Sequence, residues 1–147
     1  MPKKIIEKGD SYQHQVELTS HKVADNLGLK QEDFEICYQS KVGPLEWIKP
    51  STEETVLKHA KNGRAIILVP IAFVSEHSET LVELDIELKE EALEINKDLK
   101  YYRVDALGVK DNYIDCLANL VIKANNNNNE FCQDKICPKQ FTQCINK

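Results

Sequence analysis

A short, uninterrupted apolar run at residues 65–69, AIILV, constrains the fold more than any other part of this sequence. The run has the length of a strand and stops at Pro70, and apolar residues without polar alternation are typical of a strand covered on both faces. Such strands belong to parallel sheets that lie between layers of helices. We therefore expect residues 65–69 to form a central strand.

Segments with helix and strand patterns alternate along the rest of the chain. Helical periodicity is found at 11–27, which Gly28 ends, and at 51–61, which the S-x-x-E capping box of residues 51–54 begins. A third helix is expected at 76–95, with Leu81, Leu84 and Leu88 on the side roughly opposite the glutamates. A fourth begins at Asp111 and carries an apolar stripe that includes Ile114, Leu117 and Val121. Strand patterns are found at 34–39 and 101–104. Strands separated by helices pair in parallel through right-handed crossovers, so the order of elements predicts an α/β layer fold with three parallel strands.

Three strands are few for a parallel sheet because they leave an edge unpaired, so we expect the α/β unit to be one incomplete lobe. We place this unit at residues 1–124. A run of asparagines at 125–129 cannot bury a core and is expected to be a linker. Residues 130–147 then form a cysteine-containing tail.

The charge and the cysteine content exclude several functional classes. The chain of 147 residues carries a formal net charge of −5, and without a basic excess to neutralise phosphates we expect no nucleic-acid partner. Its five cysteines are an odd number at irregular spacings, which favours a reducing, cytoplasmic location. No apolar run approaches the ~20 residues of a membrane span, so any membrane contact is expected to be peripheral.

Two predicted loops lie where an open parallel sheet binds its ligands, in the crevice beyond the carboxyl ends of the strands. The first loop contains Gln39, Ser40 and the single tryptophan, Trp47. The second contains His77, a borderline metal ligand and near-neutral proton acceptor, and leads into Glu79. Taken alone, such a Trp is more often a core residue or lid, and such a His more often a helix-start residue.

Glu79, Glu83 and Glu87 follow one another at intervals of four residues, so they lie on one face of the predicted helix. The row repeats like charge, and the favourable pair at this spacing is Asp85 with Lys89. Carboxylate oxygens in a row offer a path to a divalent cation. Judged by spacing alone, a solvated helix face is the more common explanation of such a row.

Three stretches of the sequence carry a family resemblance. Residues 39–47, QSKVGPLEW, are similar to the Q-S-[KR]-x-G-x-x-x-W loop of the ferrochelatases. Residues 69–87, VPIAFVSEHSETLVELDIE, are similar to the signature of that family nearly letter for letter, and the string is long and highly specific. Residues 118–121, ANLV, resemble the end of the last helix of the family but are less specific. The resemblance extends from residue 2 to about residue 123.

The resemblance implies that the chain is the carboxy-terminal half of a ferrochelatase, a lyase that inserts Fe²⁺ into protoporphyrin IX to form protohaem in the last step of haem biosynthesis. Each half of such an enzyme is a chelatase-like, doubly wound parallel sheet in a three-layer α/β/α arrangement. The porphyrin lies in the cleft between the two lobes. The chain would then require the amino-terminal lobe as its partner, in cis or in trans.

The resemblance also assigns roles to individual residues. It implies that Glu79 belongs to the metal-insertion site and that Glu83 and Glu87 continue an acidic path away from it. The helix of the family begins with wide π-type turns, which bring residues four apart into a line. The residues implied to border or shape the porphyrin pocket are Gln39, Ser40, Trp47 and His77.

Protoporphyrin IX and Fe²⁺ are the implied substrates, and no bound cofactor is required. The family pairs the glutamate that matches Glu79 with a histidine of an S-x-H-[GS]-L motif, and this sequence lacks that motif. The alternative interpretation is a non-catalytic fragment of a broken ferrochelatase reading frame with weak metal or porphyrin binding. A relative that acts on another tetrapyrrole or another metal is a third interpretation.

The cysteines raise the question of a cluster, because some ferrochelatases bind [2Fe–2S] through cysteines near the carboxyl end and one earlier in the chain. Cys132, Cys137 and Cys144 have the spacing C-x4-C-x6-C, which departs from the compact spacing of those tails. Since three thiolates leave a cluster one ligand short, we expect reduced thiols instead. Cys37 and Cys116 are expected to be small core residues.

Overall fold

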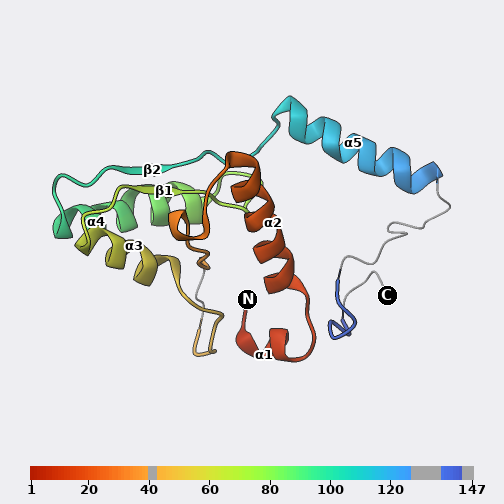
Figure 1. Cartoon of the computed structure of the whole chain (residues 1–147), viewed down its shortest axis with the longest axis horizontal. Helices are drawn as coiled ribbons and strands as arrows, with labels where there is room; N and C mark the ends of the chain where they lie inside the picture. The colour runs from red at the N-terminus through yellow and green to blue at the C-terminus, as the bar shows by residue number, and fades with distance from the viewer. Residues whose placement is uncertain (40–42, 127–136, 144–147) are drawn as a thin grey trace.

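The computed structural model describes residues 1–39, 43–126 and 137–143, and Figure 1 shows how their helices and strands are arranged. The helices are α1 (Lys3–Glu7), α2 (Tyr12–Leu27), the 3-10 helix η1 (Gln31–Asp33), α3 (Thr52–Lys61), the π-helix η2 (Glu79–Glu87), α4 (Leu88–Ile95) and α5 (Asp111–Asn126). The strands are β1 (Ile66–Leu68) and β2 (Tyr101–Arg103). All four helices predicted from the sequence are present, and the one predicted at 76–95 is divided into η2 and α4.

Local sequence signals determine where two of these helices begin and end. α2 ends at Gly28, whose φ of 69° lies in the left-handed region that glycine adopts without a steric penalty. α3 begins after Ser51, whose hydroxyl accepts a hydrogen bond from the amide of Glu54 while the Glu54 carboxylate accepts one from the amide of Ser51. Both ends agree with the sequence prediction.

The two strands form a parallel sheet in which Ile66 lies opposite Tyr101 and Leu68 opposite Arg103. The connection between them contains η2 and α4, so the mixed α/β class and the parallel pairing are confirmed. Within the described part of the chain the sheet has two strands. The doubly wound, three-layer arrangement therefore stays a prediction.

The prediction of a sheet strand at 34–39 is wrong, because within the described residues this segment does not join the sheet. Tyr38 makes a single parallel bridge, to Ser51, in which its amide donates to the Pro50 carbonyl (3.0 Å) and its carbonyl accepts from the Thr52 amide (3.1 Å). Pro50 has no N–H, and Thr52 already belongs to α3, so the partner segment cannot continue a ladder. The apolar residues of 34–39 do alternate as in a strand, but no neighbouring strand in the described residues pairs with them.

The core lies between one face of the sheet and the helices α3, η2 and α4 (Figure 1). Its buried members are Val56, Ala60, Ile66, Leu84, Leu88, Ala92, Leu99 and Tyr101. Leu84 and Leu88, predicted to lie opposite the glutamate row, are 4% and 6% exposed, whereas Leu81 is 48% exposed. Burial of these two leucines holds η2 and the start of α4 against the sheet, which fixes the helix that carries the row.

Within the residues that the structure describes, the opposite face of the sheet is open, contrary to the expectation that residues 65–69 are covered on both faces. Ile67 of β1 and its neighbour Tyr102 of β2 are 67% and 61% exposed, and Val69 and Val104 are also exposed. Successive side chains of a strand point to opposite faces, and the helices that form the core pack only on the face of Ile66 and Tyr101.

α5 lies apart from the sheet and its helices (Figure 1) and buries none of its residues. The predicted apolar stripe is present, but Ile114, Leu117 and Val121 are exposed. Cys116 is exposed too, so its expected core position is wrong, whereas Cys37 is half-buried and burial raises the pKa of its thiol. Because α5 continues through Asn126, the first two residues of the predicted linker are helical, and the other three lie outside the described residues.

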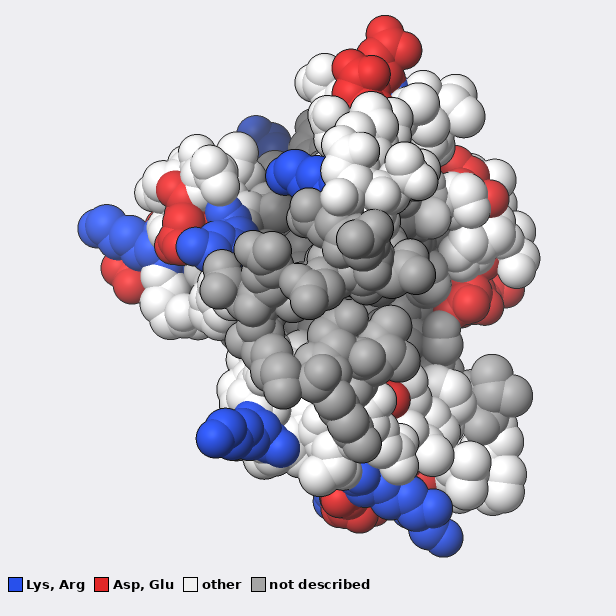
Figure 2. Space-filling view, turned by 90° about the vertical axis from the view of Figure 1, so that its right-hand side faces the viewer, with Lys and Arg blue, Asp and Glu red and all other residues white. Residues whose placement is uncertain are grey.

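Basic and acidic side chains are interspersed on the face shown in Figure 2, where the Lys and Arg groups stand apart and several adjoin Asp or Glu. No helix in the described ranges combines the length and the apolar character that crossing a bilayer requires.

Candidate functional site

The glutamate row is carried by the π-helix η2, which runs from Glu79 to Glu87. Its winding is shown by the amide of Leu88, which donates to the carbonyl of Glu83, five residues earlier. A π-helix winds more widely than an α-helix, so residues four apart come close to a straight line. The π-type turns that the family resemblance implied are thus confirmed. They place Glu79, Glu83 and Glu87 along one side of the helix.

The row meets the first predicted loop directly. The side-chain amide of Gln39 donates a hydrogen bond of 2.8 Å to a carboxylate oxygen of Glu83, 44 residues further along the chain. Glu79 and Glu83 are half-buried, and Glu87 is exposed. The structure therefore brings together Gln39 and the glutamate row, which the sequence analysis assigned to a common site.

Two contacts of the His77 ring fix this residue at the start of the glutamate row. Its Nδ1 accepts a hydrogen bond from the backbone amide of Glu79 (3.1 Å), and its ring packs edge-on against Phe73, with 4.5 Å between the ring centroids. An acceptor Nδ1 means that neutral His77 carries its proton on Nε2. In this geometry the ring offers a donor at Nε2.

Thr80 closes the turn that leads into η2. Its side chain is fully buried, its hydroxyl oxygen accepts from the His77 amide (3.0 Å), and the hydroxyl donates to the His77 carbonyl (2.9 Å). The same hydroxyl also stabilises the Glu76 carboxylate, and because it carries one proton, the two donations are alternatives. The turn is thus built from short-range bonds that fix where the row begins.

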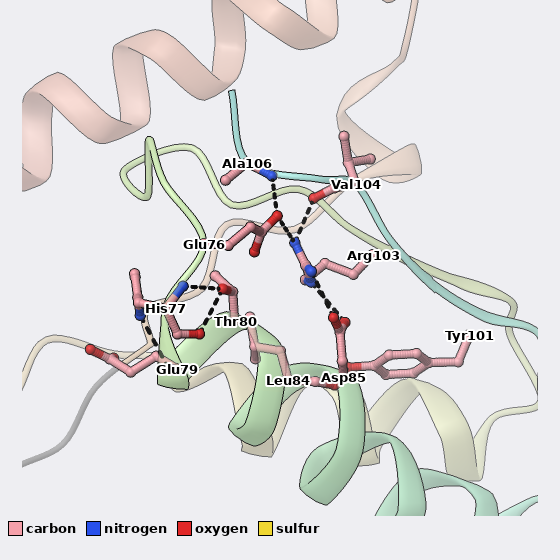
Figure 3. Close-up of polar contacts among 10 residues, drawn as sticks. All are labelled: Glu76, His77, Glu79, Thr80, Leu84, Asp85, Tyr101, Arg103, Val104 and Ala106. Carbon is pink, nitrogen blue, oxygen red and sulfur yellow. Dashed lines mark hydrogen bonds and ion pairs between the residues drawn. The ribbon is translucent and has the colours of Figure 1, made fainter. Parts of the chain in front are cut away.

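Two acidic residues that face β2 were not among the predicted site residues. Arg103 forms a two-pronged contact with Asp85, with 2.7 Å from Nε and 2.6 Å from Nη2 to the two carboxylate oxygens (Figure 3). Its Nη1 reaches Glu76 at 3.1 Å. The expected pairing of Asp85 with Lys89 is therefore replaced by a contact to the strand. The hydrogen bonds that the Arg103 guanidinium donates to Asp85 raise the pKa of the guanidinium.

Glu76 joins the loops that follow the two strands. Its carboxylate accepts the backbone amide of Ala106 at 2.7 Å as well as the Arg103 guanidinium (Figure 3). The Thr80 hydroxyl, the Ala106 amide and Arg103 together lower the pKa of Glu76 to about 2. Glu76 is therefore a carboxylate anchor beside the row, and the signal that could have revealed it is an Arg within an otherwise apolar and aromatic strand.

Of the other two predicted pocket residues, the structure describes Trp47 but not Ser40. Trp47 is half-buried and forms an antiparallel bridge with Pro2, beside a hydrogen bond from the Lys3 amide to the Glu46 carbonyl (2.8 Å). Ser40 lies outside the described residues. The bridge ties the end of the first loop to the amino-terminal segment of the chain.

The row is not a closed metal site. In the described ranges no three His, Cys, Asp or Glu side chains converge where they could share one metal ion. Within the described part of the chain, surface hollows lie along α5 and α3, and no residue of the glutamate row lines either of them. Carboxylates spread along a helix suit the passage of an ion better than its tight storage.

One of the three tail cysteines, Cys137, falls in the described part of the chain. It is half-buried, and its sulfur accepts a weak hydrogen bond from the side chain of Gln15 (3.5 Å). Cys132 and Cys144 lie outside the described residues, so the expectation of reduced thiols in place of a cluster stays a prediction.

Comparison with known proteins agrees with this geometry. The family model described as Ferrochelatase matches residues 1–125. The chain is 48% identical over 147 residues to the ferrochelatase of Pelagibacter ubique, with 98% of the chain and 42% of that protein covered. It is 43% identical over 150 residues to the ferrochelatase of Rickettsia prowazekii, with 99% and 43% covered.

These relatives are more than twice as long as the matched segment, so the chain spans less than half of their length. The family match nevertheless covers the π-helix, the row and the loop that contacts it. This chain belongs to the ferrochelatase family.

Proposed function

We propose that this chain forms the metal-delivering wall of a ferrochelatase, which inserts Fe²⁺ into protoporphyrin IX to form protohaem. The observation that carries the proposal is the alignment of Glu79, Glu83 and Glu87 on a π-helix, with Gln39 hydrogen-bonded to the middle carboxylate. Family membership supports it, because the row lies inside the matched segment.

The chemistry of insertion explains why such a row is useful. Fe²⁺ replaces two pyrrole protons, so the site has to supply ligands that release the ion and groups that take up the protons. We assign the entry of the ion to Glu87 and Glu83 and its final release to Glu79. Carboxylates can both bind Fe²⁺ through oxygen and accept a proton as the ion leaves.

His77 would act next to Glu79 at the end of the path. Its Nδ1 is engaged by the Glu79 amide, so a neutral ring can direct its Nε2–H toward the porphyrin or the leaving water of the ion. The ring thereby also fixes the backbone of Glu79. Gln39, Ser40 and Trp47 are proposed to shape the porphyrin pocket.

A second lobe completes the site in this proposal. The chain spans about two fifths of the length of its relatives, and we assign the second protein wall of a bound porphyrin to the rest of the enzyme. We assign the chain to the carboxy-terminal portion of the enzyme. By itself it is expected to show little or no insertion, because strain on the macrocycle requires opposed groups held in register.

The alternative function is a non-catalytic fragment that binds metal or porphyrin weakly. A chimera separates the two, in which this chain replaces the matching segment of the Pelagibacter ubique ferrochelatase. Insertion is followed as the loss of protoporphyrin fluorescence with Fe²⁺ under anaerobic conditions. An active chimera supports the enzyme, and an inactive chimera that is folded and binds porphyrin supports the fragment.

Within the chimera, Glu79→Gln should lower turnover by roughly a hundredfold or more, since it removes both a ligand and a proton acceptor. Glu53→Gln, an exposed carboxylate in the first turn of α3, is the matched control and should leave turnover unchanged. Equal activity of the two variants would contradict the assignment of Glu79.

A further inference from the structure

We propose that Arg103 is a positioning residue that holds η2 in the register that aligns the glutamate row. The proposal deepens the proposed function and rests on it, because the row matters only if it carries the ion. Arg103 itself is not expected to touch substrate. It acts through Asp85, which lies on η2, and through Glu76, which precedes η2.

The contact has the features of a strong one. The Arg103 side chain is only 5% exposed, and both oxygens of Asp85 receive a guanidinium N–H at 2.6–2.7 Å. A planar, two-pronged contact fixes the direction of both side chains, which a single point charge does not do. The fourth guanidinium contact, from Nη1 to the Val104 carbonyl (3.1 Å), binds the side chain to the backbone of the residue that directly follows β2.

A second contact from the same strand supports the first. Tyr101 and Arg103 are two residues apart on β2, so their side chains point to the same face of the sheet. The Tyr101 hydroxyl donates to the Leu84 carbonyl at 2.7 Å, and Leu84 is next to Asp85 in η2. Two adjacent residues of the π-helix are therefore bound by two residues of one strand face.

The contacts of Arg103 with Asp85 and of Tyr101 with Leu84 form a clamp between β2 and η2. This clamp holds η2 on the side away from the glutamate row. Asp85 stands two residues after Glu83, which turns its side chain to roughly the opposite side of a helix. Figure 3 shows the Glu79 side chain projecting away from the Arg103–Asp85 pair. The contacts from β2 can therefore fix the winding of η2 from the side that does not carry the row.

Such a clamp is needed for two physical reasons. Carboxylates in a row repel one another, and this favours any local rearrangement that separates them. A π-helix is also rare compared with the α-helix, into which the segment could rewind. The contacts of Tyr101 and Arg103 with Leu84 and Asp85 of the π-wound segment offset both effects.

The test uses the full chain and two readouts. Mn²⁺ binding is followed through the electron paramagnetic resonance signal of the free ion, and hydrogen exchange of the backbone amides of residues 84–88 is followed by NMR. The variants are Arg103→Gln and Arg103→Lys. The control is Lys58→Gln, which also removes one positive charge and its ion pair with a carboxylate, from Nζ to both oxygens of Glu35 at 2.7–2.8 Å, but on α3 and at an exposed position.

The proposal and simple electrostatics predict opposite signs for Mn²⁺. Removing a positive charge and freeing two carboxylates would by Coulomb attraction alone tighten cation binding. The positioning role predicts instead that Arg103→Gln weakens Mn²⁺ binding and speeds exchange at residues 84–88 about tenfold, the effect of losing a charged hydrogen bond. Arg103→Lys should keep part of the Mn²⁺ affinity and part of the protection from exchange. Lys58→Gln should change neither the Mn²⁺ affinity nor the exchange rates.

Tighter or unchanged Mn²⁺ binding together with unchanged exchange in Arg103→Gln would overturn the proposal. If the unaltered chain binds no Mn²⁺, the metal path of the proposed function fails on its own, and exchange alone then decides whether Arg103 holds η2. The two ideas can therefore fail separately.

Discussion

Replacing Tyr101 by Phe removes one hydroxyl from the core and leaves the ring in place. The hydroxyl donates to the Leu84 carbonyl at 2.7 Å, and Tyr101 is 7% exposed. Burial raises the pKa of Tyr101, so the group remains a neutral donor throughout the neutral range. The variant therefore isolates a single hydrogen bond between β2 and the π-helix.

The expected cost follows from that environment. A buried hydrogen bond contributes about 0.5–1.5 kcal/mol, and an acceptor left without its donor adds a desolvation cost, so we expect a loss of about 1–2 kcal/mol in the free energy of unfolding. With a urea dependence of about 2 kcal/mol per molar, the unfolding midpoint should fall by roughly 0.5–1 M. Circular dichroism at increasing urea concentration measures it.

Tyr102→Phe is the matched control, because Tyr102 is the next residue, is 61% exposed and points to the open face of the sheet. Loss of the Tyr102 hydroxyl should change the free energy of unfolding by less than about 0.5 kcal/mol. Equal costs for the two variants, or a larger cost for Tyr102→Phe, would refute the assignment of a stabilising bond between β2 and η2.

Further predictions concern the core, the carboxylate anchor and their pH dependence. Leu88→Ala, at 6% exposure, should cost about 2–5 kcal/mol in urea unfolding, whereas Leu81→Ala, at 48% exposure, should cost clearly less. The folded-state pKa of Glu76 is depressed to about 2 from an ordinary value of 4.5, so the stability that it contributes is present above pH 4.5 and lost as the pH falls toward 2. Melting temperatures over that pH range should decline less steeply in Glu76→Gln, and identical profiles would contradict the role of this carboxylate.

Patterns that depend on neighbours in sequence were read correctly. The capping box at Ser51 and the left-handed Gly28 are decided by residues within one helical turn, and both were predicted. The straight glutamate row could be anticipated because the long string at residues 69–87 is specific to one family. Gln39 was expected beside the same crevice, but its hydrogen bond to Glu83 was not predicted.

Patterns that depend on partners distant in the sequence were not interpreted correctly. Asp85 was paired with Lys89 by the rule for residues four apart, which assumes α-helical winding and overlooks a strand 18 residues later. Residues 34–39 alternate like a strand, but sheet membership requires a partner, and the segment beside Tyr38 turns at once into α3. In the same way, Ile67 belongs to an apolar run whose second covering layer is not part of the described chain.

The single tryptophan provides the chain with an internal optical reporter. Trp47 is the only indole, and it is half-buried in its bridge with Pro2, at the end of the loop that starts at Gln39. Its emission therefore comes from one environment, with no second emitter to average. Porphyrins absorb where tryptophan emits, so the proposed seating of a porphyrin near this loop would quench Trp47 by energy transfer, and its arrival could be timed without a label and without turnover.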